Sequence, residues 1–244
     1  LFDSFEDPKI EETYQYLSKN VEQFESYRSQ LNLDISTEKF LEIIAKLEEG
    51  QKLGYRLYGF SSLSFAANTQ DQKAQIGISR VQQFLAEIEN RTLFFSLWWK
   101  ALDDQNAARL LDASGDYRYF LEQIRSMKPY TLSEPEEKVI NIKNVTGSSA
   151  LDMLYDSITN RYVFKVEAEG ETQELTRGEL MSLVRTSDPD LRARAYQELY
   201  RVYGEDAPIL GQIYQNVVRD WKNEHVGLRG YKSPISVRNT VNDL

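Results

Sequence analysis

The chain has 244 residues, of which 41% are hydrophobic and 27% charged, and its 38 acidic and 29 basic side chains give a formal net charge of −9. This acidic balance argues against a nucleic-acid partner, because such partners require a basic surface that releases counterions from phosphates. The absence of cysteine excludes a disulfide framework and thiolate-bound metal. A composition without cysteine fits a cytoplasmic location. No apolar run approaches the roughly 20 residues that cross a bilayer, so we expect no membrane partner.

The first residues resemble neither a signal peptide nor a natural start. Residues 1–7, Leu-Phe-Asp-Ser-Phe-Glu-Asp, are acidic, whereas a signal peptide has a basic segment before an apolar one. Because the first residue is Leu1 rather than methionine, we expect the sequence to be trimmed at this end.

Three long helices are predicted in the first part of the chain. Asp7 followed by Pro8 is typical of an N-cap and a first helical position, and apolar residues then recur at helical spacing until a predicted end near Asn32. A second helix is predicted to start at Ser36 with a capping sequence. A third is predicted from about Asp71 to Leu102, with a helical apolar period.

Two features of these helices have alternative interpretations. Three glycines and the aromatic residues 55–60 lie in the second helix and indicate either a kink or a closely packed interior, and we expect the helix to continue. Phe94-Phe95 and Trp98-Trp99 could form an aromatic wall that binds peptides, but Phe95 and Trp98 share a stripe with residues 84 and 88. That shared stripe favours a helix–helix core.

The second half of the chain predicts shorter elements. Helices are expected at 104–113, 117–126, 136–144 and 149–159, followed by a β-hairpin at 162–175 with its turn at Glu169-Gly170-Glu171. Thr176 and Asp188 are predicted helix caps. The last long helix contains four apolar residues, namely Ile209, Ile213, Val217 and Trp221. The predicted fold class is mainly α, with long antiparallel helices plus a small subdomain with one β-hairpin.

Most catalytic arrangements can be excluded from the sequence. His225 is the only histidine, so a zinc site of the H-E-x-x-H type, which needs two imidazoles one helical turn apart, cannot form within this chain. Phosphate-binding glycine loops and a G-x-S-x-G elbow are also absent. We expect four adjacent carboxylate pairs to be solvated on helix surfaces: Glu11-Glu12, Glu48-Glu49, Asp103-Asp104 and Glu136-Glu137.

Five short motifs, in this order and spacing, carry a resemblance to a known family. They are LSEPEE at 132–137, FKVE at 164–167, LTRGEL at 175–180, SDPDLR at 187–192 and RGYKSP at 229–234. Together they resemble the amino-terminal half of oligoendopeptidase F-type zinc metallopeptidases, relatives of thimet oligopeptidase. The resemblance is best from about residue 120 to 242.

The resemblance implies an activity whose central residues this chain lacks. It implies hydrolysis of short peptides inside an enclosed channel by a zinc ion on an H-E-x-x-H helix downstream of RGYKSP, in a carboxy-terminal catalytic half. The chain should therefore contain no catalytic residue and bind no zinc itself. We expect a helical region at 1–112, a small subdomain at 113–186, and at 187–244 the start of the catalytic domain.

The loop that contains RGYKSP holds the candidate site residues. The resemblance places Arg229, Tyr231, Ser233 and His225 beside the substrate channel, where a phenol and a guanidinium could hold a peptide. The alternative is structural: Arg229 pairs with an acidic neighbour, Tyr231 packs, and Ser233 caps the next helix.

Two functions follow from the sequence. The first is the non-catalytic amino-terminal portion of a zinc oligoendopeptidase, which would lack its partner half and could self-associate through the apolar face of the last helices. The second is a stand-alone helical module that binds peptides or proteins without catalysis.

Overall fold

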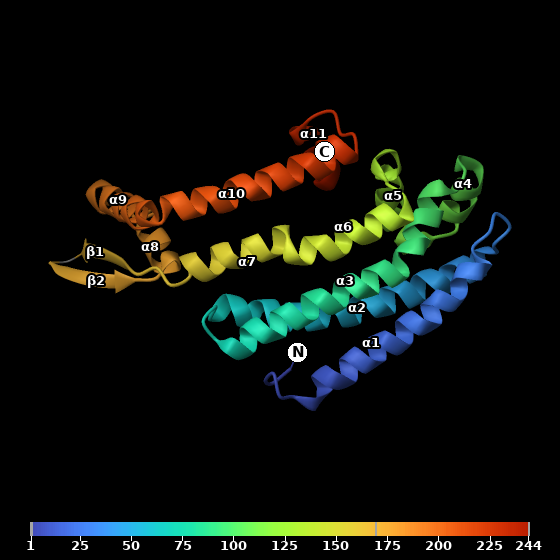
Figure 1. Cartoon of the computed structure of the whole chain (residues 1–244), viewed down its shortest axis with the longest axis horizontal. Helices are drawn as coiled ribbons and strands as arrows, with labels where there is room; N and C mark the ends of the chain where they lie inside the picture. Colours follow the sequence, from blue (N-terminus) through green and yellow to red (C-terminus); the bar gives the residue numbers. More distant parts are fainter. Residues whose placement is uncertain (1, 169, 244) are drawn as a thin grey trace.

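Long helices dominate the computed structural model, which describes residues 2–168 and 170–243. The helices α1 (Pro8–Ser26), α2 (Thr37–Ala67) and α3 (Gln72–Ala101) lie side by side in an antiparallel bundle, drawn in blue to green in Figure 1. All three begin at the predicted caps: the side chains of Asp7, Ser36 and Asp71 accept hydrogen bonds from backbone N–H groups of the first turn, at 2.9–3.2 Å. The helix α2 is continuous through its three glycines, so the predicted continuation is confirmed.

The first helix is shorter than predicted. It ends at Ser26 rather than near Asn32, and a 3₁₀ turn (Tyr27–Gln30) follows it. The chain therefore tightens before it turns into α2, a common way for an α-helix to end.

Aromatic side chains form the core at one end of the bundle. Phe24, Phe40, Phe95 and Trp99 are almost fully buried there, and the indole N–H of Trp99 donates to the backbone oxygen of Leu121 at 2.9 Å. The helices α4 (Asp104–Asp112) and α5 (Arg118–Ser126) close this end. The core interpretation of the aromatic residues is confirmed. Phe95 is buried as predicted, but the fully buried tryptophan is Trp99, while Trp98 is half-buried and packs against the same core.

Two nearly collinear helices run through the middle of the molecule. The helices α6 (Glu134–Thr146) and α7 (Ser148–Thr159) are separated by Gly147, and α6 lies against α3. The amide of Asn90 on α3 donates to the backbone oxygen of Lys138 at 3.1 Å and accepts from Asn141 at 2.9 Å. On the other side of this pair lies α10 (Ala207–Lys222), which contacts α7 (Figure 1).

The hairpin lies at the far end of α7. Its strands β1 (Phe164–Ala168) and β2 (Glu171–Leu175) pair antiparallel with Phe164 opposite Leu175, and β1 begins two residues later than predicted. Leu1, Leu244 and Glu169, which was predicted for the turn, lie outside the described residues. The helices α8 (Arg177–Leu183) and α9 (Pro189–Glu205) cover the strands through a small core of Phe164, Val166, Leu180, Ala195 and Val202. The predicted fold class, mainly α with one hairpin, is confirmed.

The end of the chain folds back beside α5. After α10 come a π-helical segment (Asn223–Leu228) and α11 (Pro234–Val241), and Asp243 accepts hydrogen bonds from Tyr119 and Gln123 on α5. No helix in the described part of the chain has both the length and the apolar character needed to span a membrane.

The apolar side chains of α10 differ in exposure. Ile209 is exposed, but Ile213 is buried, and Val217 and Trp221 are half-buried. The apolar face that was expected to allow self-association is therefore partly covered, because α10 packs against α7.

Candidate functional site

The backbone of residues 223–233 departs from regular helix where α10 ends. The N–H of Arg229 donates to the backbone oxygen of Glu224 at 2.9 Å, a five-residue spacing typical of a π-helical turn. Gly230 has a φ of +77°, a left-handed conformation that favours glycine, and the N–H of Tyr231 then donates to the oxygen of His225 at 3.1 Å. The loop is thus tied back onto the helix end, and such π-turns are frequent at functional sites.

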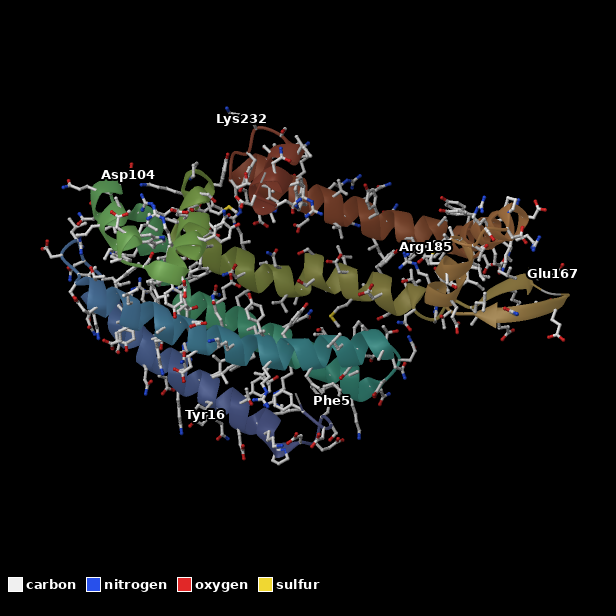
Figure 2. All side chains as sticks on the ribbon, turned by 180° about the vertical axis from the view of Figure 1, so that it is seen from behind. Phe5, Tyr16, Asp104, Glu167, Arg185 and Lys232 are labelled. Atoms are coloured by element: carbon white, nitrogen blue, oxygen red, sulfur yellow. The ribbon has the colours of Figure 1, made fainter. Side chains whose placement is uncertain are left out.

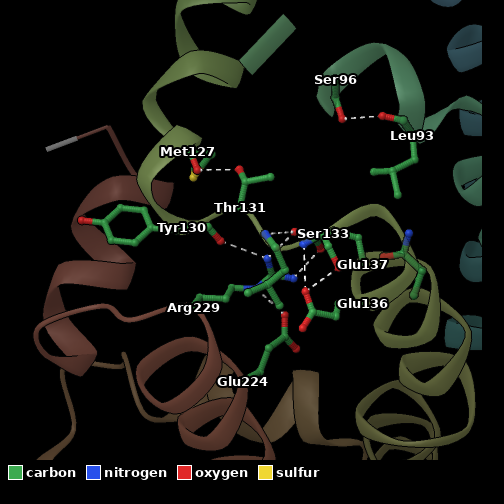
Figure 3. Close-up of polar contacts among 12 residues, drawn as sticks. Leu93, Ser96, Met127, Tyr130, Thr131, Ser133, Glu136, Glu137, Glu224 and Arg229 are labelled. Atoms are coloured by element: carbon green, nitrogen blue, oxygen red, sulfur yellow. Dashed lines mark hydrogen bonds and ion pairs between the residues drawn. The ribbon is translucent and has the colours of Figure 1, made fainter. Parts of the chain in front are cut away.

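Arg229 is the centre of a buried network, which Figure 3 shows. Its Nη1 and Nη2 donate to the two carboxylate oxygens of Glu137 at 2.8 Å each, and its Nε donates to Glu224 at 2.8 Å. Nη1 also donates to the backbone oxygen of Tyr130 at 3.2 Å. A single guanidinium therefore connects three segments: Glu137 on α6, Glu224 on the π-helical segment and Tyr130 just before α6.

The network keeps Glu137 ionised despite its burial. Burial alone would raise the pKa of the Glu137 carboxyl, but the hydrogen bonds from Arg229 and from the N–H of Leu132, with the charges of Arg229 and Lys100, outweigh it. The pKa of Glu137 therefore lies below its ordinary value. The bonds to Glu137 and Glu224 likewise raise the pKa of Arg229. Arg229 is therefore a permanently charged side chain that is paired with two acidic residues.

Tyr231 packs face to face against Tyr130. The ring centroids are 3.5 Å apart with an interplanar angle of 14°, and Tyr231 is only 5% exposed. Its hydroxyl donates to the sulfur of Met127 at 3.5 Å, a weak acceptor. Burial raises the pKa of the Tyr231 phenol, so the group stays protonated and able to donate.

His225 lies between two aromatic rings. Its ring centroid is 5.0 Å from that of Trp221 and 6.1 Å from that of Tyr231, both in edge-to-face geometry. Its Nδ1 is buried and has no hydrogen-bond partner among the described residues. Burial lowers the pKa of the imidazole, with Arg229 lowering it further against the opposing charges of Glu224 and Asp220. Burial thus favours the neutral imidazole of His225, and its Nδ1 is left without a partner in the part of the chain that the structure describes.

Ser233 caps α11. Its hydroxyl accepts from the N–H of Ser236 at 3.3 Å, and the Ser236 hydroxyl accepts from the N–H of Ser233 at 3.1 Å. Between these fixed points, Lys232 is exposed and extends away from the molecule (Figure 2). The structure thus joins Arg229, Tyr231 and His225 in one cluster, with Ser233 at its edge.

Sequence reasoning missed the acidic partners of Arg229. Glu137 was expected to be solvated as half of the Glu136-Glu137 pair, and this is wrong: Glu137 is 7% exposed, whereas Glu136 is exposed and completes the capping box with Ser133. The available signal was helical spacing, since Glu137 lies one turn before Asn141, which contacts α3. The pairing of Arg229 with Glu224 could be suggested only by their closeness in the sequence.

The donor set does not fit a zinc centre. The chain has one histidine and no cysteine, and the residues that the structure describes contain no group of three or more His, Cys, Asp or Glu side chains placed to hold a metal ion. The loop cluster offers positioning and hydrogen bonding, and no metal-assisted step can be derived from it.

Comparisons with known proteins agree with the sequence resemblance. The family model described as Oligopeptidase F matches residues 98–164. Group B oligopeptidase PepB of Streptococcus agalactiae is 26% identical over 196 residues, and oligopeptidase PepF of Bacillus subtilis is 23% identical over 126 residues. These alignments cover 77% and 48% of this chain but only 26% and 18% of the relatives, so the chain spans about a quarter of the first protein's length.

Solved structures show the same fold. Oligoendopeptidase F from Enterococcus faecium superposes with a TM-score of 0.79 at 20% identity, over 97% of this chain and 47% of the other. A peptidase-like protein from Chlamydophila abortus superposes with a TM-score of 0.57 at 15% identity, over 94% of this chain and 40% of the other. The resemblance to oligoendopeptidase F-type proteins is therefore confirmed.

Proposed function

We propose that this chain is the amino-terminal, non-catalytic portion of a zinc-dependent oligoendopeptidase that hydrolyses short peptides inside an enclosed channel. The observation that carries the proposal is the sequence similarity to a relative named an oligopeptidase, which extends over 77% of the chain. The shared fold with an oligoendopeptidase F over nearly the whole chain supports it.

In this proposal the missing carboxy-terminal half supplies the chemistry. The zinc ion and the H-E-x-x-H helix belong to that half, which fits the single histidine of this chain. The parent protein works in the cytoplasm. We keep the division into a helical region at 1–112, a small subdomain at 113–186 and the start of the catalytic domain at 187–244.

The loop cluster has two roles in the proposal. Arg229 and Ser233 position the loop, because the guanidinium is committed to Glu137 and Glu224, and Ser233 to its cap. Tyr231 and the Nδ1 atom of His225 are buried here, so these two residues contact peptide beside the channel once the loop opens. Both are suited to that contact, because the phenol gives its proton only to a weak sulfur acceptor and His225 Nδ1 has no partner among the described residues. A peptide carbonyl is a better acceptor than the thioether of Met127.

Reassembly of the two halves tests this proposal. The coding frame is read past Leu244, and a downstream segment with H-E-x-x-H is expressed separately and mixed with this chain. We expect zinc-dependent cleavage of a fluorogenic peptide by the mixture and none by this chain alone. Chelator-sensitive cleavage by the purified chain alone would overturn the non-catalytic assignment.

A second candidate function rests on exposed apolar side chains. Tyr196 and Tyr200 on α9 stack on each other and are 44% and 71% exposed, and Ile209 and Tyr214 on α10 are 54% and 70% exposed. Exposed apolar side chains of this kind fit a stand-alone helical module that binds peptides or proteins, and also self-association of the chain. A frame that stops near Leu244, with no separate partner gene product that binds the chain, would favour this function over the first.

A further inference from the structure

A pocket of about 350 Å³ lies inside the α1–α3 bundle. All three helices line it, and none of its residues belongs to the loop cluster at 223–233. Its volume is at the small end of the range of about 300–1,000 Å³ found for small-molecule sites. Most of the wall is apolar, from Leu17, Val21, Phe24, Leu47, Leu85 and Ile88.

Two glycines on α2 shape the wall of this pocket. A Cβ at Gly50 would lie 2.8 Å from Asn20 Oδ1, and one at Gly54 would lie 3.2 Å from a methyl group of Leu85. Glycine inside a helix costs about 0.5–1 kcal/mol relative to alanine. The 31-residue α2 has two such glycines one turn apart, and both lie where α2 approaches its neighbouring helices and the pocket forms.

One of the polar residues that line the pocket, Glu89, carries a carboxylate that is unpaired in the described part of the chain. Gln51, Tyr55 and Glu89 are the exposed members of the pocket and mark its mouth between α2 and α3. The carboxylate of Glu89 has neither a hydrogen bond nor an ion pair with another described residue. Although part of Glu89 is exposed at the mouth, desolvation of its carboxylate by the surrounding protein and, secondarily, the negative charge of Glu137 raise its pKa, so a nearby cation would relieve an unfavourable charge.

Asn20 adds an acceptor within the pocket. It is 5% exposed, and its Nδ2 already donates to the Lys46 backbone oxygen at 3.4 Å and to Glu49 at 3.1 Å. Both amide protons are therefore used, and Oδ1 is left as the group with acceptor capacity. Inside the apolar wall the available polar atom is this amide oxygen, and the mouth adds the carboxylate of Glu89 beside Gln51 and Tyr55. The carboxylate and the amide oxygen complement a ligand that donates hydrogen bonds and carries positive charge.

We propose that this pocket binds an ammonium group on a small apolar body, with the carboxylate of Glu89 as counter-ion and the pocket between α1, α2 and α3 as the apolar enclosure. Two sources have this chemistry: a free alkylamine and the amino terminus of a short peptide whose first side chain is apolar. A leucine-sized group is within the volume available. The inference does not depend on the proposed peptidase function, because it concerns binding to this chain by itself.

Binding measurements on the chain at pH 7.5 test the proposal. Titration by calorimetry and by amide NMR shifts uses four probes: hexylamine, hexanol, Leu-Gly-Gly and N-acetyl-Leu-Gly-Gly. We expect hexylamine to bind with shifts at pocket residues and hexanol to bind at least tenfold more weakly. Leu-Gly-Gly binding that acetylation abolishes would identify the peptide source, and binding of hexylamine alone would identify the free amine.

Three variants distinguish binding inside the pocket from attraction of the amine to the general surface charge. Glu89→Gln keeps the shape and removes the charge, and we expect it to weaken hexylamine binding on the order of tenfold or more, as for other charge-assisted contacts. Glu87→Gln is the matched control on the same helix and should leave binding unchanged. Ile88→Phe should narrow the pocket and weaken binding, with circular dichroism as the check of folding. Equal binding by hexylamine and hexanol, unchanged binding in Glu89→Gln, or no binding of any charged probe would overturn the proposal.

Discussion

Arg229 and Glu137 lie 92 residues apart in the sequence, yet the guanidinium donates to both carboxylate oxygens at 2.8 Å. Both side chains are largely buried, at 16% and 9% exposure. The pair fixes the loop after α10 onto the first turn of α6, and α6 in turn lies against α3. The ion pair is therefore one of the contacts that hold the candidate site against the bundle, together with the stacking of Tyr231 on Tyr130.

Breaking this pair should destabilise the fold strongly. We expect Glu137→Leu to lower the free energy of unfolding by about 3 kcal/mol, because it leaves the buried guanidinium with only Glu224 as a charged partner. Arg229→Met should have an effect of similar size. The double variant should lose less than the sum of the two, since it leaves no unpaired charge at this contact. Urea denaturation of the four proteins measures this.

An exposed pair provides the control for that experiment. Arg118 and Glu122 on α5 are 52% and 45% exposed, so Arg118→Met should change the free energy of unfolding by no more than about 1 kcal/mol. The pKa of Glu137 is lowered in the fold, so its contribution is present above its ordinary value of 4.5 and is lost as pH falls through the folded value. Glu137→Leu and the parent should therefore converge in stability under acid. Strict additivity of the two single variants would show that the pair is not coupled.

Protonation of His225 should cost stability below neutral pH. Its pKa is lowered from 6.5 by burial, so the unfolded chain takes up a proton first as pH falls. The contribution of the neutral imidazole is complete above pH 6.5 and declines as pH falls toward the folded value. His225→Phe keeps the edge-to-face contacts with Trp221 and Tyr231 and removes this titration. Melting temperatures from pH 8 to 5 should fall more steeply in the parent, and parallel curves would contradict this.

The backbone of the loop should require glycine at position 230. Gly230 has a φ of +77°, and a side chain there is strained by about 1–2 kcal/mol although a Cβ would meet nothing within 4 Å. Gly211 in α10 also has open space, but it lies in regular helix. Gly230→Ala should therefore destabilise the chain, while Gly211→Ala should stabilise it by about 0.5–1 kcal/mol. Chemical denaturation measures the change in the free energy of unfolding of each variant. Equal changes in the two variants would rule out backbone strain at position 230.

The sequence predicted what depends on local chemistry and spacing. Asp7, Ser36 and Thr176 cap their helices as expected, because capping needs only a side-chain oxygen and nearby N–H groups. Helical spacing could indicate which face of α6 holds Glu137, but its partner was not predictable in this way, since that partner is an arginine 92 residues away. The pocket of the bundle was missed for the same reason: Gly50 and Gly54 lie in an ordinary helical pattern, and their role appears only when α1 and α3 are placed beside them.

In the full-length parent, the two loop residues should respond differently to substitution. Tyr231→Phe removes only the hydroxyl, which donates to a weak sulfur acceptor, so its stability cost should be small. If the phenol holds peptide, the variant should raise KM by a factor on the order of ten with kcat retained, because one hydrogen bond of about 1–1.5 kcal/mol is lost in ground and transition state alike. Arg229→Ala should instead lower the melting temperature, because it removes the partner of Glu137. Steady-state kinetics, zinc content and melting curves distinguish the two. A Tyr231→Phe enzyme with unchanged KM would assign the tyrosine to packing against Tyr130 alone, and a collapse of kcat with KM intact would place the phenol among the groups that stabilise the transition state.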